Sequence, residues 1–280
     1  MAALSSDSFK YSPTGWTCMK IVTGLFWVSE MARILFINRY SGNPYPEGIT
    51  RLLDFSFLTS SPFNYILFAV LCGAVVLYVL EKKMLITLAA LSFISVVVFT
   101  IERAQGVQSR SELLSMIFIA QFVAYLYKRD KEPHNTAIFF SVQMVAAAYT
   151  LSGITKLMTS GLDWVVNAQN SVLQITKIFG QLRIELGFAA GIGYSQWLTG
   201  VLLNHPHLAQ FLFAVALAIE LFAFVCLFSK TWARRYGLLL LALHIGMLFT
   251  VGIAIPVFVV MLLVYPVNVF GLFVRNELPN

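Results

Sequence analysis

Long apolar runs constrain this chain more than any other feature of its sequence. Of its 280 residues 59% are hydrophobic and 11% are charged, whereas a soluble domain averages about 25% charged residues. A helix that crosses a membrane needs about 20 largely apolar residues. We therefore predict an all-α, polytopic transmembrane helix bundle of about eight spans (seven to nine), forming a single integral membrane domain over 1–280. The expected spans are 19–37, 63–80, 84–101, 113–128, 137–157, 208–228, 236–254 and 256–273.

Basic residues gather in alternate short loops between these runs. Those on one side of the expected bundle are Lys10, Lys20, Lys82, Lys83, Lys128, Arg129, Lys131, Lys230, Arg234 and Arg235. Short cytoplasmic loops carry an excess of lysine and arginine, so we predict a cytoplasmic N-terminus. The formal charge of +6 reflects this asymmetry between loops and does not indicate nucleic-acid binding.

The segment 158–207 is the one long connection and is expected on the outer face. Residues 162–179 place Leu162, Val165, Val166, Val172, Leu173 and Phe179 near one helical face, which is the pattern of an amphipathic interfacial helix. Residues 186–203 are apolar enough for a further span, but a further crossing would move Lys230 and its neighbours outside. We predict a surface-lying or re-entrant segment, where Gly187 and Gly191 allow bends.

Ionisable residues within spans each need a reason, because insertion of one costs about 2.5–3.5 kcal/mol. Glu30 and Arg33 are three residues apart in the first span and share a helix face. We predict that they pair. The pair could serve packing alone or line a cavity.

Lys156 ends the fifth expected span, on one stripe with Tyr149 and Ser152, and Trp164 follows. Two interpretations stay open. In the first, the lysine extends to the outer interface and is anchored beside Trp164. In the second, the amine is buried near the hydroxyls and away from carboxylates, and desolvation favours its neutral, basic form.

Two further ionisable residues lie inside the C-terminal spans. Glu220 is in mid-span with no basic residue within one turn, so without a partner from another helix it is expected to be protonated. His244 is in mid-span of the next run, and an imidazole suits proton transfer near neutral pH. Spacing alone does not show whether Lys156, Glu220 and His244 converge.

The remaining polar groups indicate packing rather than chemistry. Gln121 and Gln143 are typical of hydrogen-bond partners between helices. Cys18, Cys72 and Cys226 have neither disulfide nor zinc spacing. Two histidines around Pro206 are a weak metal signal, and we predict no metal site.

The run Tyr149-x-x-Ser152-Gly153-Ile154-x-Lys156-Leu157, followed by Trp164, resembles the central motif of the vitamin K-dependent gamma-carboxylase-like (HTTM) membrane family. Ile219-Glu220-Leu221 and His244-Ile245-Gly246 also resemble family helices, and the likeness covers about 137–270. It implies a small bacterial inner-membrane protein with Lys156 as the base that deprotonates a reduced quinone, His244 and Glu220 as neighbouring catalytic groups, and Tyr149, Ser152 and Trp164 as cofactor-binding residues. The family's large luminal domain is missing, which argues against protein gamma-carboxylation.

Three hypotheses follow. The first is an integral membrane enzyme that acts on a quinol or lipid. The second is a non-catalytic subunit, similar to DoxX-type proteins, that anchors or couples a redox partner protein. The third is a proton-coupled transporter, for which the sequence offers no inverted repeat.

Overall fold

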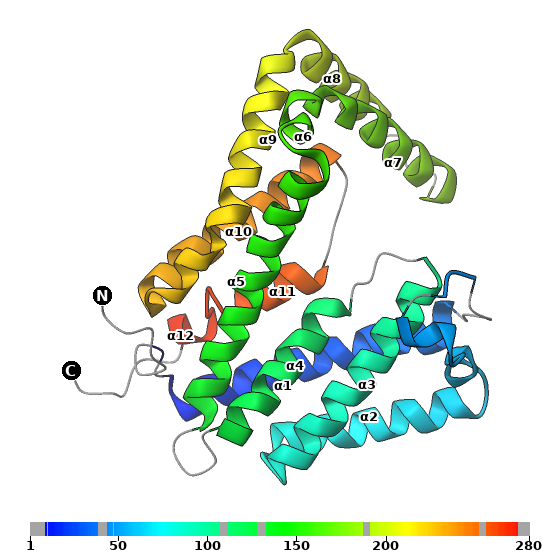
Figure 1. The fold of residues 1–280 in the computed structure, drawn as a ribbon, viewed down its shortest axis with the longest axis vertical. Helices are drawn as coiled ribbons and strands as arrows, with labels where there is room; N and C mark the ends of the chain where they lie inside the picture. The colour runs from blue at the N-terminus through cyan, green and yellow to red at the C-terminus, as the bar shows by residue number, and fades with distance from the viewer. Residues whose placement is uncertain are drawn as a thin grey trace.

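The computed structural model describes residues 9, 11–38, 44–46, 48–106, 111–127, 133–186, 191–251 and 256–273, and its elements within those ranges are helices. The lower part of Figure 1 contains α1 (Pro13–Ala32), α2 (Phe63–Val79), α3 (Met84–Ala104) and α4 (Glu112–Tyr127). Each packs against its successor in the chain, and α4 packs against α5 (Pro133–Ser160). A π-helical turn, Arg33–Asn38, continues α1.

The upper part of Figure 1 is built on the C-terminal half of α5. It contains α6 (Asp163–Val166), α7 (Ser171–Leu186), α8 (Gly191–Asn204), α9 (Pro206–Leu221) and α10 (Lys230–Val251). A 3-10 segment, Phe222–Leu227, extends α9. The short helices α11 (Pro256–Val264) and α12 (Phe270–Phe273) return to pack against α1.

A polar network ties the lower helices together inside the apolar core. Gln121 on α4 accepts a hydrogen bond from the Tyr78 hydroxyl at 2.7 Å and donates to Ser141 at 3.1 Å and to Tyr265 at 2.9 Å. The Tyr265 hydroxyl also pairs with Thr23 on α1 at 3.1 Å. The prediction that Gln121 joins helices is therefore confirmed, and each polar group of this network has a hydrogen-bond partner.

Three helices in the described residues are long and apolar enough to cross a membrane, namely Met84–Ala104, Pro133–Ser160 and Pro206–Leu227. They correspond to three of the expected spans. Helices α2 and α4 are apolar but shorter, with 17 and 16 residues. The all-helical prediction and compatibility with a membrane hold, whereas the count of eight spans is not reached.

The expected last span, 256–273, does not form one helix. Helix α11 has nine residues, about 14 Å at 1.5 Å per residue, against a hydrocarbon thickness of about 30 Å. The chain turns at Tyr265 and Pro266. Proline disfavours helical backbone in the residue before it, a signal that the apolar run concealed.

The segment 158–207 forms α6, α7 and α8, and α7 packs against α8 as a helical hairpin. Gly161 ends α5 with a φ of +57°, and the 3-10 turn Ala168–Asn170 divides the expected helix 162–179. Of the predicted apolar face, Leu162 and Leu173 are exposed. The buried contacts instead join residues of the first turns of the hairpin to α8 and α9: Ala168, Val172, Ile175, Leu198, Leu202 and Ala209. Gly187 lies outside the described residues.

Lys20 also differs from expectation. It lies within α1 and is fully buried, with its amine 2.7 Å from Glu81 Oε1 and 2.9 Å from the Val79 carbonyl oxygen. Lys20 therefore binds polar groups at the C-terminal end of α2 and is not a loop residue.

Candidate functional site

Two side chains of α5 face α9 and α10 from positions two turns apart. Tyr149 meets α10 and Lys156, seven residues later, meets α9. Helical residues at this spacing share one face. Gly153 lies between them, and a Cβ there would approach Leu221 atoms on α9 to 3.0 Å. The missing side chain therefore lets α5 and α9 come close.

Lys156 forms an ion pair with Glu220. Its amine lies 2.6 Å from Oε1 of Glu220 and also bonds Oε2. The carboxyl side chain is 7% exposed and the lysine side chain is 27% exposed. The sequence analysis left open whether Glu220 has a partner on another helix, and that partner is Lys156. The expectation that a buried amine would lie away from carboxylates is wrong. Each of the two residues finds its partner on another helix, and spacing within the sequence does not reveal such a contact.

Trp164 covers the same amine. The Lys156 amine lies 4.7 Å from the centre of the Trp164 ring, within reach of a cation–π interaction. Trp164 is itself packed against Phe213 of α9, with ring centres 4.8 Å apart. Trp164 therefore lies beside Lys156, as the anchored interpretation expected, but the Lys156 amine turns inward toward α9. Among the described side chains, Ser152 makes no hydrogen bond to this amine.

In the second pair, the Tyr149 hydroxyl is hydrogen-bonded to the Nε2 atom of His244. Both residues are buried, at 4% and 5% exposed. Phe258 of α11 stacks on the imidazole, with ring centres 5.7 Å apart, and meets the Tyr149 ring edge-on. The other imidazole nitrogen, Nδ1, is buried and has no hydrogen-bond partner among the described residues.

The two pairs lie on one face of α5. Tyr149 and Lys156 are seven residues apart, about 10 Å along the helix, and their partners come from α10 and α9. An amine, a carboxyl, a phenol and an imidazole are therefore gathered on three helices in apolar surroundings. Each of these groups can give or take a proton. The structure thus places Lys156, Glu220, His244 and Tyr149 together, whereas Ser152 stands apart from their hydrogen bonds.

A different charged cluster lies at the end of α1. Arg33 contacts Glu30 at 2.8 Å, which confirms the predicted pairing, and it also contacts Glu102 of α3 at 3.1 Å. Glu102 is fully buried and accepts a hydrogen bond from Ser111 at 2.6 Å. Glu102 lies one residue beyond the expected span 84–101, but α3 continues past it to Ala104.

The described residues contain no group of three or more His, Cys, Asp or Glu side chains that could hold a metal ion. His207 instead pairs with Gln210 at 3.1 Å. The cysteines Cys18, Cys72 and Cys226 are free.

Comparisons with protein-family models, with curated proteins and with solved structures found no match.

Proposed function

We propose that this chain is an HTTM-like integral membrane enzyme that transfers protons to or from a quinol or another lipid bound beside α5, α9 and α10. The observation that carries the proposal is the Lys156–Glu220 ion pair next to the Tyr149–His244 hydrogen bond. Ionisable residues facing a membrane bundle's interior are costly and commonly functional. The resemblance of the motif around Lys156 supports the same assignment.

The ion pair changes how Lys156 would act as a base. The amine becomes basic when its proton moves to Glu220, which leaves a neutral amine and a neutral carboxylic acid. No charge is created by that step, and apolar surroundings disfavour the alternative of two separated charges. The neutral amine could then accept the proton of a quinol hydroxyl, which leaves a quinolate beside the Lys156 ammonium. Release of the Glu220 proton to water would restore the ion pair.

Access to the site would come from the Lys156 end. Tyr149 and His244 are nearly buried, whereas the Lys156 side chain is partly exposed. In this proposal Trp164 borders the entrance, and the unpaired Nδ1 atom of His244 offers the ligand a hydrogen bond. Tyr149 would hold the imidazole through its Nε2 atom.

Mass spectrometry of lipids extracted from the purified protein tests this proposal. We expect a quinone to co-purify with the wild type and with Lys177→Gln, a control at an exposed lysine of α7. The quinone should be lost from Lys156→Met. Arginine cannot lose its proton, so Lys156→Arg should fail in turnover of the reduced quinone even if it retains the ligand. Wild-type quinone content in Lys156→Met would refute the proposal.

A non-catalytic membrane subunit that couples a redox partner is the second candidate. Helices α5 and α9 approach closely at Gly153, and the Lys156–Glu220 ion pair also joins them. This close packing favours the second candidate, in which the ion pair serves only to hold the two helices together. Arginine at position 156 should be fully functional in that case, and affinity capture of a redox protein should be unaffected by Lys156→Arg.

The membrane orientation is part of the proposal. The Lys230 amine lies over the Tyr11 ring, 4.3 Å from its centre, so the start of α10 and the N-terminal segment lie at the same end. We propose that this end is cytoplasmic and that 158–207 is outside, in a bacterial inner membrane.

Single cysteines at Asn170 and Lys230 on a cysteine-free background test this orientation. An impermeant thiol reagent should label 170 from outside, and labelling of 230 alone would reverse the assignment.

A further inference from the structure

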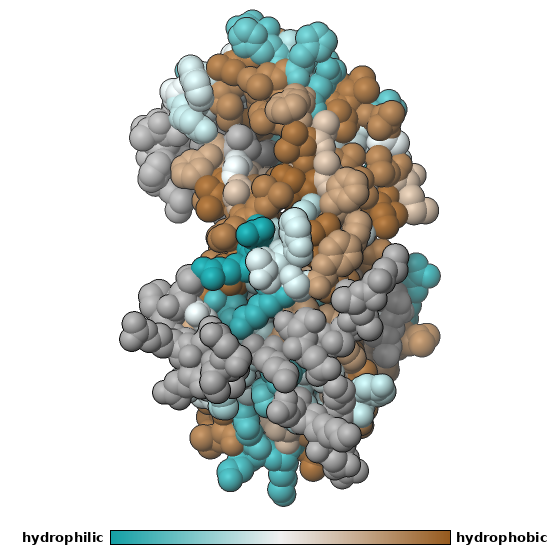
Figure 2. All heavy atoms as spheres, turned by 90° about the vertical axis from the view of Figure 1, so that its left-hand side faces the viewer, coloured by the Kyte–Doolittle hydropathy of each residue, from teal (hydrophilic) through white to brown (hydrophobic). Residues whose placement is uncertain are grey.

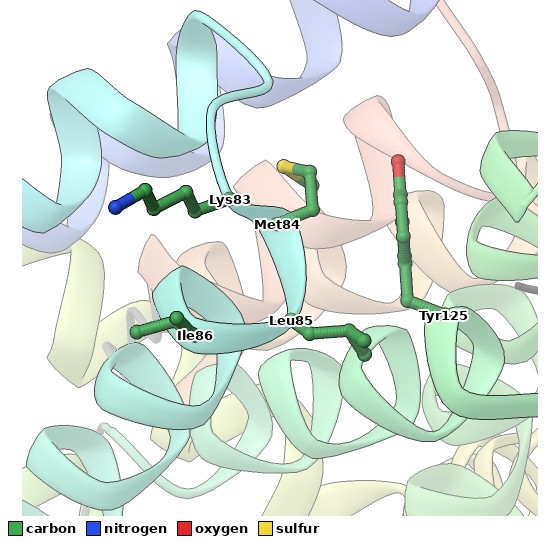
Figure 3. A pocket seen from close by; sticks show the side chains of 5 residues that line it. All are labelled: Lys83, Met84, Leu85, Ile86 and Tyr125. Atoms are coloured by element: carbon green, nitrogen blue, oxygen red, sulfur yellow. The ribbon is translucent and has the colours of Figure 1, made fainter.

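The turn between α2 and α3 borders a hollow that the proposed chemistry does not use. A cavity of about 490 Å³ is lined by Lys83, Met84, Leu85, Ile86 and Tyr125. Figure 3 shows Leu85 extending toward the Tyr125 ring, while Lys83 extends away from it, so that the ammonium lies at the rim. The hollow thus combines an apolar wall with a cationic edge.

The charge at this rim is unbalanced among the described residues. Glu81 is the acidic residue of the turn, and Lys20 from α1 already pairs with it at 2.7 Å. Lys82 and Lys83 are both exposed and form no ion pair within the described part of the chain. The Lys83 ammonium is therefore available to an anion at the mouth of the cavity, and Lys82 precedes it in the same turn.

The apolar wall continues onto the surface of the bundle. Ile86 is 68% exposed and Leu80 is 59% exposed, on the two sides of the turn. An occupant of this site would need an anionic head at the lysines and an apolar tail on these side chains.

We propose that this cavity binds an anionic phospholipid, with its phosphate at Lys82 and Lys83 and an acyl chain along Leu85, Ile86 and Tyr125. Basic residues at the ends of membrane helices attract anionic lipid headgroups, each contributing about 1 kcal/mol. The tail requirement distinguishes this occupant from a free phosphate ester. The site rests on membrane insertion of the bundle, but not on the chemistry proposed for Lys156.

Native mass spectrometry of protein released from nanodiscs with equal parts of phosphatidylglycerol and phosphatidylcholine tests the site. We expect the wild type to retain phosphatidylglycerol preferentially. The Lys82→Gln/Lys83→Gln variant should lose that preference by about fivefold per lysine, on the order of 25-fold in total. The matched control Lys177→Gln and the charge-retaining Lys82→Arg/Lys83→Arg should behave as the wild type.

Three results would overturn the proposal. One is equal retention of both lipids by the wild type, and another is an unchanged preference in the double glutamine variant. The third is displacement of the lipid by soluble glycerol phosphate, which would indicate a site for a free anion. Thermal melting of each variant in detergent checks that the exposed substitutions leave the fold intact, and quinone content reports separately on the Lys156 site.

Discussion

The two halves of the molecule use buried polar groups differently. In the lower half, Gln121 joins four helices and the turn after α11 through bonds that satisfy each partner. In the upper half, a partly exposed lysine pairs with a carboxyl, and the nearby imidazole keeps one nitrogen unpaired. Buried atoms without a partner among the described residues, such as Trp27 Nε1 and Ser92 Oγ, also occur in the lower half. The difference therefore lies in the partly exposed ion pair, since ionisable groups gathered in this way are typical of functional sites.

Burial of the spanning helices shows the same contrast. Half of the most apolar window is buried in α3 and in α5, at 50% each, against 22% in Pro206–Leu227. Figure 2 shows hydrophobic side chains over the upper part of the face on which α9 and α10 lie. Exposed members on these two helices include Phe211, Leu212, Leu238 and Phe249. We interpret the lower half as a more tightly packed scaffold and the upper half as the part that holds the proposed quinol ligand.

The largest loss of stability is expected from Arg33→Met in the scaffold. The substitution removes the cation that contacts both Glu30 and the fully buried Glu102. Removing one partner of a buried ion pair costs about 3–5 kcal/mol. Glu30→Gln/Arg33→Met should recover only part of this, because Glu102 remains. Equilibrium unfolding in detergent measures it, and additive effects of the two single changes would exclude coupling.

Gly153→Ala is expected to have the next largest effect. The new Cβ would approach Leu221 side-chain atoms to 3.0 Å and its backbone nitrogen to 3.1 Å, and overpacking costs about 1–3 kcal/mol. The control is Gly200→Ala on α8, where no atom lies within 4 Å of the added Cβ. Since alanine favours helix over glycine by about 1 kcal/mol, the control should be neutral or stabilising. A stable Gly153→Ala protein would mean that α5 and α9 are less closely packed.

A smaller effect is expected from Gln121→Leu. It removes the hydrogen bonds to Tyr78, Ser141 and Tyr265. Hydrogen bonds between membrane helices average about 0.6 kcal/mol, so the loss should be about 1–2 kcal/mol. Gln143→Leu on α5 is the matched control, at a half-buried position outside this network. Equal losses of thermal stability in Gln121→Leu and Gln143→Leu would contradict the prediction that the Gln121 network adds stability.

Much of the fold could be predicted from local patterns, and most of the site could not. The apolar runs predicted α2, α3, α4, α5 and α9, because the length of an apolar run can be read from consecutive residues alone. The spacing of Glu30 and Arg33 predicted their pairing for the same reason. Glu102 and Glu220 gained their partners across helices, and no spacing within one helix encodes that. The break at Pro266 was visible in the sequence but was outweighed by the apolar residues around it.

The central claim is that the charges at Lys156 and Glu220 serve the ligand and not the fold. The double variant Lys156→Met/Glu220→Leu tests it most directly, through melting temperature and quinone content measured on the same preparation. Replacing both members of a buried ion pair by apolar residues is often neutral or stabilising. We predict a melting temperature near that of the wild type and no bound quinone. A double variant that keeps the wild-type quinone content, or that unfolds while quinone binding in the residual folded protein is unchanged, would contradict the claim.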